Sequence, residues 1–88
     1  MNTFHLSCFL AVAEYLNFTQ AAQQLHVTHP AVSQQIQSLE KELGVELIHR
    51  ENRRFTVTPT GQYFYSHCKA ILGQVEDLIR ETKRLGQD

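Results

Sequence analysis

Residues 28 to 43 read THPAVSQQIQSLEKEL, and this stretch decides the fold because its two faces differ in chemistry. Apolar residues recur at helical spacing and form one stripe, which is predicted to pack in a core: Val32, Ile36, Leu39 and Leu43. The opposite face is polar and mostly uncharged: Pro30, Gln34, Gln37 and Lys41, flanked by His29, Ser33 and Ser38. Most such faces are only solvated, but Ser and Gln also hydrogen-bond to base edges in a DNA major groove.

Two shorter helices are predicted before this stretch. The first runs from Thr3, as N-cap, to Tyr15, and the second covers residues 20–25 with Thr19 as N-cap. The helix of the opening stretch begins at Thr28 or at His29: threonine is the better cap, but a residue before proline avoids the α region. Only about three residues are left for the turn between the second and third helices. Two helices joined by such a short turn predict a helix-turn-helix over about residues 18–37.

A β-hairpin is predicted after the third helix, which Gly44 ends. Residues 47–50 and 55–58 can pair as strands around the segment Glu51-Asn52-Arg53-Arg54. Such a hairpin is a wing, and its loop would place Arg53 and Arg54 at the tip. From there the two arginines would reach the phosphate backbone beside the groove.

A long last helix is predicted from Thr58, as N-cap, and Pro59 to about Leu85, with Gly86 capping its end. Its apolar positions alternate steps of four and three and form a heptad seam, which we assign to dimerisation: Phe64, Cys68, Ile71, Leu72, Val75, Leu78, Ile79 and Leu85. At 1.5 Å per residue the helix is about 40 Å long, more than a small three-helix core covers. A homodimer through this helix is therefore expected.

Length and composition set further bounds. With 88 residues, 42% of them hydrophobic, the chain makes one small domain with a thin margin of stability. The net charge of −1 gives no overall basic surplus, but Arg50, Arg53 and Arg54 make a local basic spot. Cys8 and Cys68 stand far apart without metal-ligand spacing, which fits reduced thiols in a cytoplasmic protein.

Other functional classes find little support. Residues 4–13 form an apolar run that ends like a signal-peptide cleavage site, but no Lys or Arg precedes Lys41 and the run is too short to span a bilayer, so no membrane contact is expected. The pairs His5 and Cys8, and His26 and His29, lack further metal ligands nearby in sequence. Since no motif supplies an activated nucleophile or a phosphate loop, we expect no catalytic residue, metal or cofactor, and hence no enzyme.

One family carries nearly the whole of this pattern. The segments FLAVAEYLNFTQAAQQLHVTHPAVSQQIQSLEKELGVELIHR and TPTG resemble the winged helix-turn-helix and linker helix of LysR-type transcriptional regulators, over residues 1 to about 86. The resemblance implies base contacts from the third helix and backbone contacts from Thr19 and the wing. Together with Gln37 on the polar face, the predicted DNA-binding residues are Thr19, Thr28, His29, Pro30, Ser33, Gln34, Gln37, Arg50, Arg53 and Arg54.

Two of these residues depart from the family pattern: His29 stands where a Gln is frequent, and Gln34 where an Arg is frequent. Both departures leave the fold unchanged and bear on base preference. Resemblance to the family also implies that a small-molecule effector binds a C-terminal domain that this chain lacks.

We therefore predict a mainly α fold, a winged helix-turn-helix with a three-helix core and a two-stranded β wing in residues 1–58, followed by a linker and dimerisation helix in residues 59–88. The predicted function is sequence-specific binding of double-stranded operator DNA, an inverted repeat, with the recognition helix 29–43 in the major groove. The alternative is a helical dimerisation module whose polar third helix binds a protein.

Overall fold

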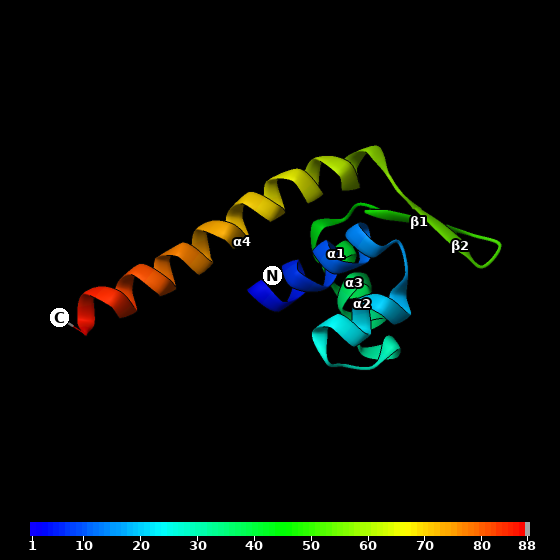
Figure 1. Cartoon of the computed structure of the whole chain (residues 1–88). Helices are drawn as coiled ribbons and strands as arrows, with labels where there is room; N and C mark the ends of the chain where they lie inside the picture. The colour runs from blue at the N-terminus through cyan, green and yellow to red at the C-terminus, as the bar shows by residue number, and fades with distance from the viewer. Residues whose placement is uncertain (88) are drawn as a thin grey trace.

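The computed structural model describes residues 1–87 and contains three helices, a two-stranded hairpin and a long fourth helix, in that order (Figure 1). These elements are α1 (Thr3–Tyr15), α2 (Phe18–Leu25), α3 (His29–Leu43), β1 (Ile48–Glu51), β2 (Arg54–Val57) and α4 (Pro59–Gly86). The predicted mainly helical winged helix-turn-helix is confirmed. None of the helices within these residues combines the length and the apolar character needed to cross a membrane.

Asparagines cap the first two helices, so both predicted threonine caps are wrong. Asn2 rather than Thr3 caps α1: its side chain accepts from the backbone N–H of His5 at 2.9 Å, and the His5 ring completes a capping box. Asn17 caps α2 in the same way, so this helix begins before Thr19. In each case the asparagine stands one or two residues earlier than the threonine and reaches a free N–H of the first turn.

The recognition helix α3 has clear ends. Thr28 is the N-cap, since its hydroxyl accepts from the N–H of Ala31 at 3.2 Å, and this settles the choice between Thr28 and His29. At the other end Gly44 ends the helix with a φ of 70°, a left-handed conformation that glycine adopts at low cost. The predicted bounds of α3 are thus confirmed.

The core lies where α1 meets α2, α3 and the start of the hairpin. Apolar side chains that are completely or almost completely buried come from each of these elements: Phe9 and Val12, Ala21, Val32, Ile36 and Leu39, and Leu47 and Ile48. The inward stripe predicted for α3 is therefore confirmed except for Leu43, which is 37% exposed. This packing leaves the other side of α3 free.

The wing, residues 48–57, is tighter than predicted. Its strands pair from Ile48 opposite Val57 to Glu51 opposite Arg54, and only Asn52 and Arg53 form the turn. Both turn residues have positive φ, 49° and 65°, as a two-residue turn of this hand requires. Arg53 is therefore at the tip, whereas Arg54 belongs to β2, and the prediction that both arginines occupy the loop is wrong.

Helix α4 enters the fold through a close contact with the segment before the wing. The backbone N–H of Thr58 donates to the carbonyl oxygen of Leu47 at 3.0 Å, and the Thr58 hydroxyl caps α4 by accepting from the N–H of Gly61 at 2.9 Å. A Cβ atom on Gly61 would lie 2.1 Å from that carbonyl oxygen. Only glycine fits at this position, which explains the last residue of the TPTG segment.

The first half of α4 belongs to the domain's own core. Phe64 meets Phe9 edge to face with ring centroids 5.4 Å apart, and the Cys68 thiol donates to the Leu6 carbonyl oxygen at 3.4 Å. Phe64 and Cys68 are thus packed within their own chain, so the first half of α4 shares the core of the winged helix-turn-helix. The helix also runs one residue further than predicted, through Gly86, with Gln87 rather than Gly86 as its C-cap.

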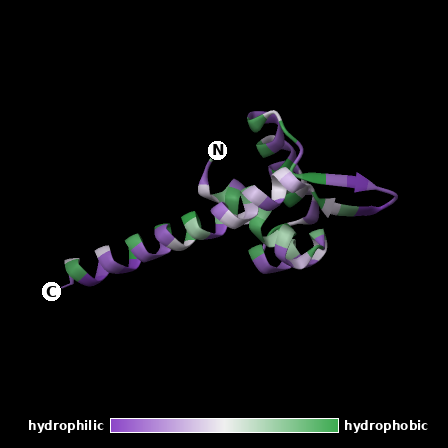
Figure 2. Ribbon diagram, turned by 90° about the horizontal axis from the view of Figure 1, so that it is seen from above, coloured by the Kyte–Doolittle hydropathy of each residue, from purple (hydrophilic) through white to green (hydrophobic). Residues whose placement is uncertain are grey.

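The second half of α4 extends beyond the other elements, and apolar and polar residues alternate along it (Figures 1 and 2). Its large apolar side chains are exposed in the single chain: Ile71 by 48%, Leu78 by 66%, Ile79 by 50% and Leu85 by 62%. Leu72 and Val75 are half-buried. An apolar surface of this kind is unusual on a monomer.

Both thiols should be unreactive in the folded chain. Burial raises the pKa of Cys8 and of Cys68 from 9.0 to about 11. At pH 8 the thiolate is then about a hundredfold scarcer than in the unfolded chain, so labelling by a disulfide reagent should follow unfolding. The raised pKa values also stabilise the fold below pH 9, and this contribution is lost as the pH rises through 11.

Labelling rates measured with and without denaturant at pH 8 test this expectation. Cys8→Ala and Cys68→Ala, each labelled alone, assign the rate to one thiol. Equal rates for the native and denatured chain would contradict it.

Candidate nucleic-acid interface

Three elements meet at Phe18, the first residue of α2. The His29 ring at the start of α3 stacks on the Phe18 ring with centroids 5.2 Å apart and planes 5° apart. Phe55 of β2 meets Phe18 edge to face at 5.0 Å, and the Arg50 guanidinium of β1 lies over the ring at 5.5 Å. We call these four residues the Phe18 cluster. It places the wing beside the N-terminal end of α3.

The side chains predicted to contact DNA from the helices are mostly free. Six of them are exposed: Thr19, Thr28, His29, Pro30, Gln34 and Gln37. Ser33 is half-buried, and the Thr28 hydroxyl is already engaged as the N-cap of α3. The face therefore offers amide groups, one hydroxyl and an imidazole at the end of α3 that lies nearest the wing.

The three predicted wing arginines are all exposed but differ in their surroundings. Arg50 pairs with Phe55 across the strands, on the side of the wing that faces Phe18. Arg53 is at the tip, held at a φ of 65° that a non-glycine residue rarely adopts. Arg54 pairs with Glu51 on the other side of the wing.

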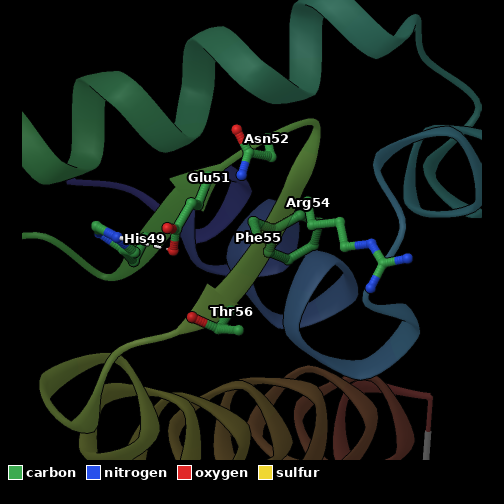
Figure 3. A pocket seen from close by; sticks show the side chains of 6 residues that line it. All are labelled: His49, Glu51, Asn52, Arg54, Phe55 and Thr56. Atoms are coloured by element: carbon green, nitrogen blue, oxygen red, sulfur yellow. Dashed lines mark ion pairs between the residues drawn. The ribbon is translucent and has the colours of Figure 1, made fainter.

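That other side carries acidic groups. The His49 ring lies 3.7 Å from a Glu46 carboxylate and 3.8 Å from the Glu51 carboxylate. An open hollow of about 390 Å³ lies on this side of the wing. Figure 3 shows the side chains of His49 and Glu51 close together there and the Arg54 guanidinium pointing away from them. None of the three wing arginines forms an ion pair among the described residues, and Arg50 lies on the side of the wing opposite these carboxylates.

Glu40 holds the wing to α3 and was not predicted as a site residue. Its carboxylate accepts from the N–H of Leu47 at 2.7 Å and from the N–H of Ile48 at 3.2 Å. Hydrogen bonds to a carboxylate are stronger than neutral ones, so they fix where β1 starts. No role was predicted for Glu40 or for Phe18, whose partners come from other elements of the fold. No local signal indicated either contact.

An exposed helix face of short polar side chains next to guanidinium groups is the combination that reads base edges and grips phosphates in double-stranded DNA. Residues 4–62 match the family described as "Bacterial regulatory helix-turn-helix protein, lysR family". The chain belongs to this family. Its members are regulators and not enzymes, and the predicted resemblance is confirmed.

Bacterial relatives align with nearly all of the chain. The regulator BenM of Acinetobacter baylyi is 41% identical over 85 residues, which cover 97% of this LysR-family chain and 28% of BenM. AlsR of Bacillus subtilis is 43% identical over 84 residues, covering 96% and 28% of the two chains. The chain thus spans less than a third of the length of these relatives.

Solved structures extend the likeness to three dimensions. The crystal structure of the "BenM_DBD/catB site 1 DNA Complex" has a TM-score of 0.95 and 40% sequence identity, covering 100% of this chain and 99% of that one. The "CbnR_DBD-DNA complex" has a TM-score of 0.89 and 34% identity, covering 98% and 99%. Both are similar to this LysR-family chain along the whole of α4 as well as in the winged core.

Proposed function

We propose that this chain binds double-stranded DNA sequence-specifically, as the DNA-binding part of a LysR-type transcriptional regulator. The observation that carries the proposal is the placing of the exposed polar end of α3 directly beside Arg50 of the wing, through the Phe18 cluster. In this arrangement α3 enters the major groove and the wing lies on the neighbouring phosphates. The DNA complexes of the similar BenM and CbnR chains support the same assignment.

Base reading is assigned to the outward residues of α3 and phosphate contact to the wing. Gln34 and Gln37 are exposed and can each offer an amide donor and acceptor, which suits adenine, while Ser33 suits several bases. Thr19 on α2 and Thr28 at the cap are assigned to the backbone. Arg50 and Arg53 grip phosphate, and Arg54, on the acidic side of the wing, contributes less.

Substitutions at Arg53 and Ser33 should separate these two roles. Arg53→Gly should weaken binding about equally on all duplexes and lower the salt slope by roughly 1, because a phosphate contact is lost. The same change should raise the free energy of unfolding by about 0.5 to 1 kcal/mol, since glycine tolerates a positive φ. Ser33→Ala should instead change which base is preferred and leave the slope unchanged.

The measurements are selection from a random-sequence duplex library, followed by titration of the selected duplex at several salt concentrations. Lys83→Ala, at the far end of α4, serves as the matched loss of a positive charge and should leave the slope as it is. Binding that does not depend on salt would contradict DNA binding and favour a protein partner for α3. A changed base preference in Arg53→Gly would reverse the two assignments.

We also propose that the chain acts as a homodimer through the second half of α4. The exposed apolar residues of that half, from Ile71 to Leu85, need a partner, and an identical helix supplies a matching seam. Two recognition helices in a symmetric dimer read an inverted repeat, with half-sites about 34 Å apart. The proposed dimer and its inverted-repeat operator therefore both rest on the exposed apolar residues of α4.

The proposed cellular location follows from DNA binding. A regulator that binds operator DNA works in the cytoplasm of a bacterium, and we place the protein there. The BenM and AlsR relatives are more than three times as long as this chain, and we assign an effector-binding domain to the part of these relatives outside the matched region. Response to a small molecule is assigned to that part.

A further inference from the structure

We propose that Phe18 is a positioning residue for DNA recognition: its ring holds the Arg50 guanidinium in place for a phosphate and ties it to the reading end of α3. This inference rests on the proposed DNA binding and names a residue that touches neither base nor phosphate. It assigns a function to the aromatic ring itself, beyond its share in packing.

The backbone of Phe18 is held in place by the cap of α2, independently of the contacts of its ring. Asn17 caps α2 through a 2.9 Å hydrogen bond from the N–H of Gln20, so the next residue has a set direction. Its ring is half-buried and meets Phe55 edge to face at 5.0 Å, which restricts its rotation. A ring held in this way is a rigid platform.

Two side chains, one cationic and one polar, pack against the Phe18 ring. The Arg50 guanidinium lies 5.5 Å from the ring centroid, within the range of a cation–π contact, and the His29 ring stacks at 5.2 Å. Among residues 1–87, Arg50 is the one arginine whose guanidinium lies over an aromatic ring. A free arginine loses much rotamer freedom when it binds phosphate, whereas Arg50 has lost part of it already.

The space next to the platform suits a phosphate. A solvent-open hollow of about 320 Å³ lies between Phe18 and the wing, and its charged lining residues are Arg50, Arg53, Arg54 and Glu51. A phosphate here would meet the three wing arginines, whose charge exceeds that of the single Glu51 carboxylate. The stacked His29 ring belongs to the helix to which we assign base reading. Removing the Phe18 ring should therefore weaken the Arg50 contact and leave the Arg53 contact as it is.

A double-mutant cycle tests the coupling, with a duplex selected by the wild-type chain as the probe. Arg50→Ala should weaken binding about tenfold in the wild type, the lower range for a charge-assisted hydrogen bond, but only about twofold in Phe18→Leu. The salt slope should fall by about 1 in Arg50→Ala and by nearly as much in Phe18→Leu. Phe18→Tyr keeps the ring and should restore the full effect of Arg50→Ala.

Two controls separate this role from packing. Phe64→Leu removes a ring from the other edge-to-face pair, with Phe9, and should lower stability without changing the effect of Arg50→Ala. Arg53→Gly should cost the same factor in the wild type and in Phe18→Leu. Should Phe18→Leu not fold, Phe18→Met, whose unbranched and flexible side chain fills irregular space, takes its place in the cycle.

Equal effects of Arg50→Ala in the wild type and in Phe18→Leu would overturn the inference. So would Arg50 side-chain protons without a ring-current shift in the nuclear magnetic resonance spectrum of the wild-type chain, a measurement that needs no variant of Phe18. Failure of the proposed function looks different, since wild-type binding would then be absent or independent of salt.

Discussion

Gly61→Ala should lower the free energy of unfolding by about 2 to 3 kcal/mol, a large share of the stability of so small a domain. The added Cβ would lie 2.1 Å from the Leu47 carbonyl oxygen and 2.8 Å from a Val57 methyl group. One of these neighbours is backbone and cannot rotate away. The same carbonyl oxygen accepts from the backbone N–H of Thr58. A shift that relieved the clash would therefore also break the hydrogen bond that holds the start of α4 to the domain.

Thermal unfolding measures this effect, with an expected fall in the midpoint of roughly 10 to 20 °C for a domain of this size. Gly73→Ala is the matched control on the same helix, because an added Cβ there meets no heavy atom within 4 Å among residues 1–87. It should stabilise the helix by about 0.5 to 1 kcal/mol. Equal effects of the two substitutions would contradict the close contact at Gly61.

Leu78→Asp should convert the dimer to a monomer and weaken binding to an inverted-repeat duplex at least a hundredfold. Leu78 is 66% exposed in the single chain, so the substitution costs the monomer little. In a dimer it would bury an unpaired charge in an apolar contact. Loss of the second half-site removes the gain from bivalent binding, which is commonly 10² to 10⁴.

Sedimentation velocity at micromolar concentration gives the assembly state, and titration with one-half-site and two-half-site duplexes gives the affinity. Gln74→Asp places the same charge at an exposed polar position of α4 and should leave the dimer intact. A wild-type chain that already sediments as a monomer would show that the exposed residues of α4 do not dimerise on their own.

Local sequence signals predicted the elements whose causes are local. The apolar stripe of α3 and the left-handed Gly44 that ends it were predicted because each depends on a few neighbouring residues. The caps failed for a related reason: Asn2 and Thr3 are adjacent and can make the same hydrogen bond, so the sequence does not distinguish them. The turn failed because neither Asn52 nor Arg53 is glycine, although both adopt positive φ.

Contacts between distant residues account for what could not be predicted. A heptad pattern records that Cys68 is apolar, but whether it meets its own α1 or a partner depends on how α4 lies across the domain. The contact of Glu40 with the N–H groups at the start of the wing bridges seven and eight residues across the end of a helix. The exposure of the polar face of α3 could be predicted because it depends only on helical spacing and not on contacts with distant residues.

The Glu40 contact has a practical consequence for redesigning operator preference. Glu40 is part of α3, so the wing is attached to the same helix that reads the bases and keeps its place when the helix surface is changed. Libraries that vary only Ser33, Gln34 and Gln37 would therefore select for new target sequences while the phosphate contacts of the wing stay unchanged. A recognition helix transplanted without a carboxylate at position 40 would release the wing, and selections from such grafts would confuse poor base matching with a misplaced hairpin.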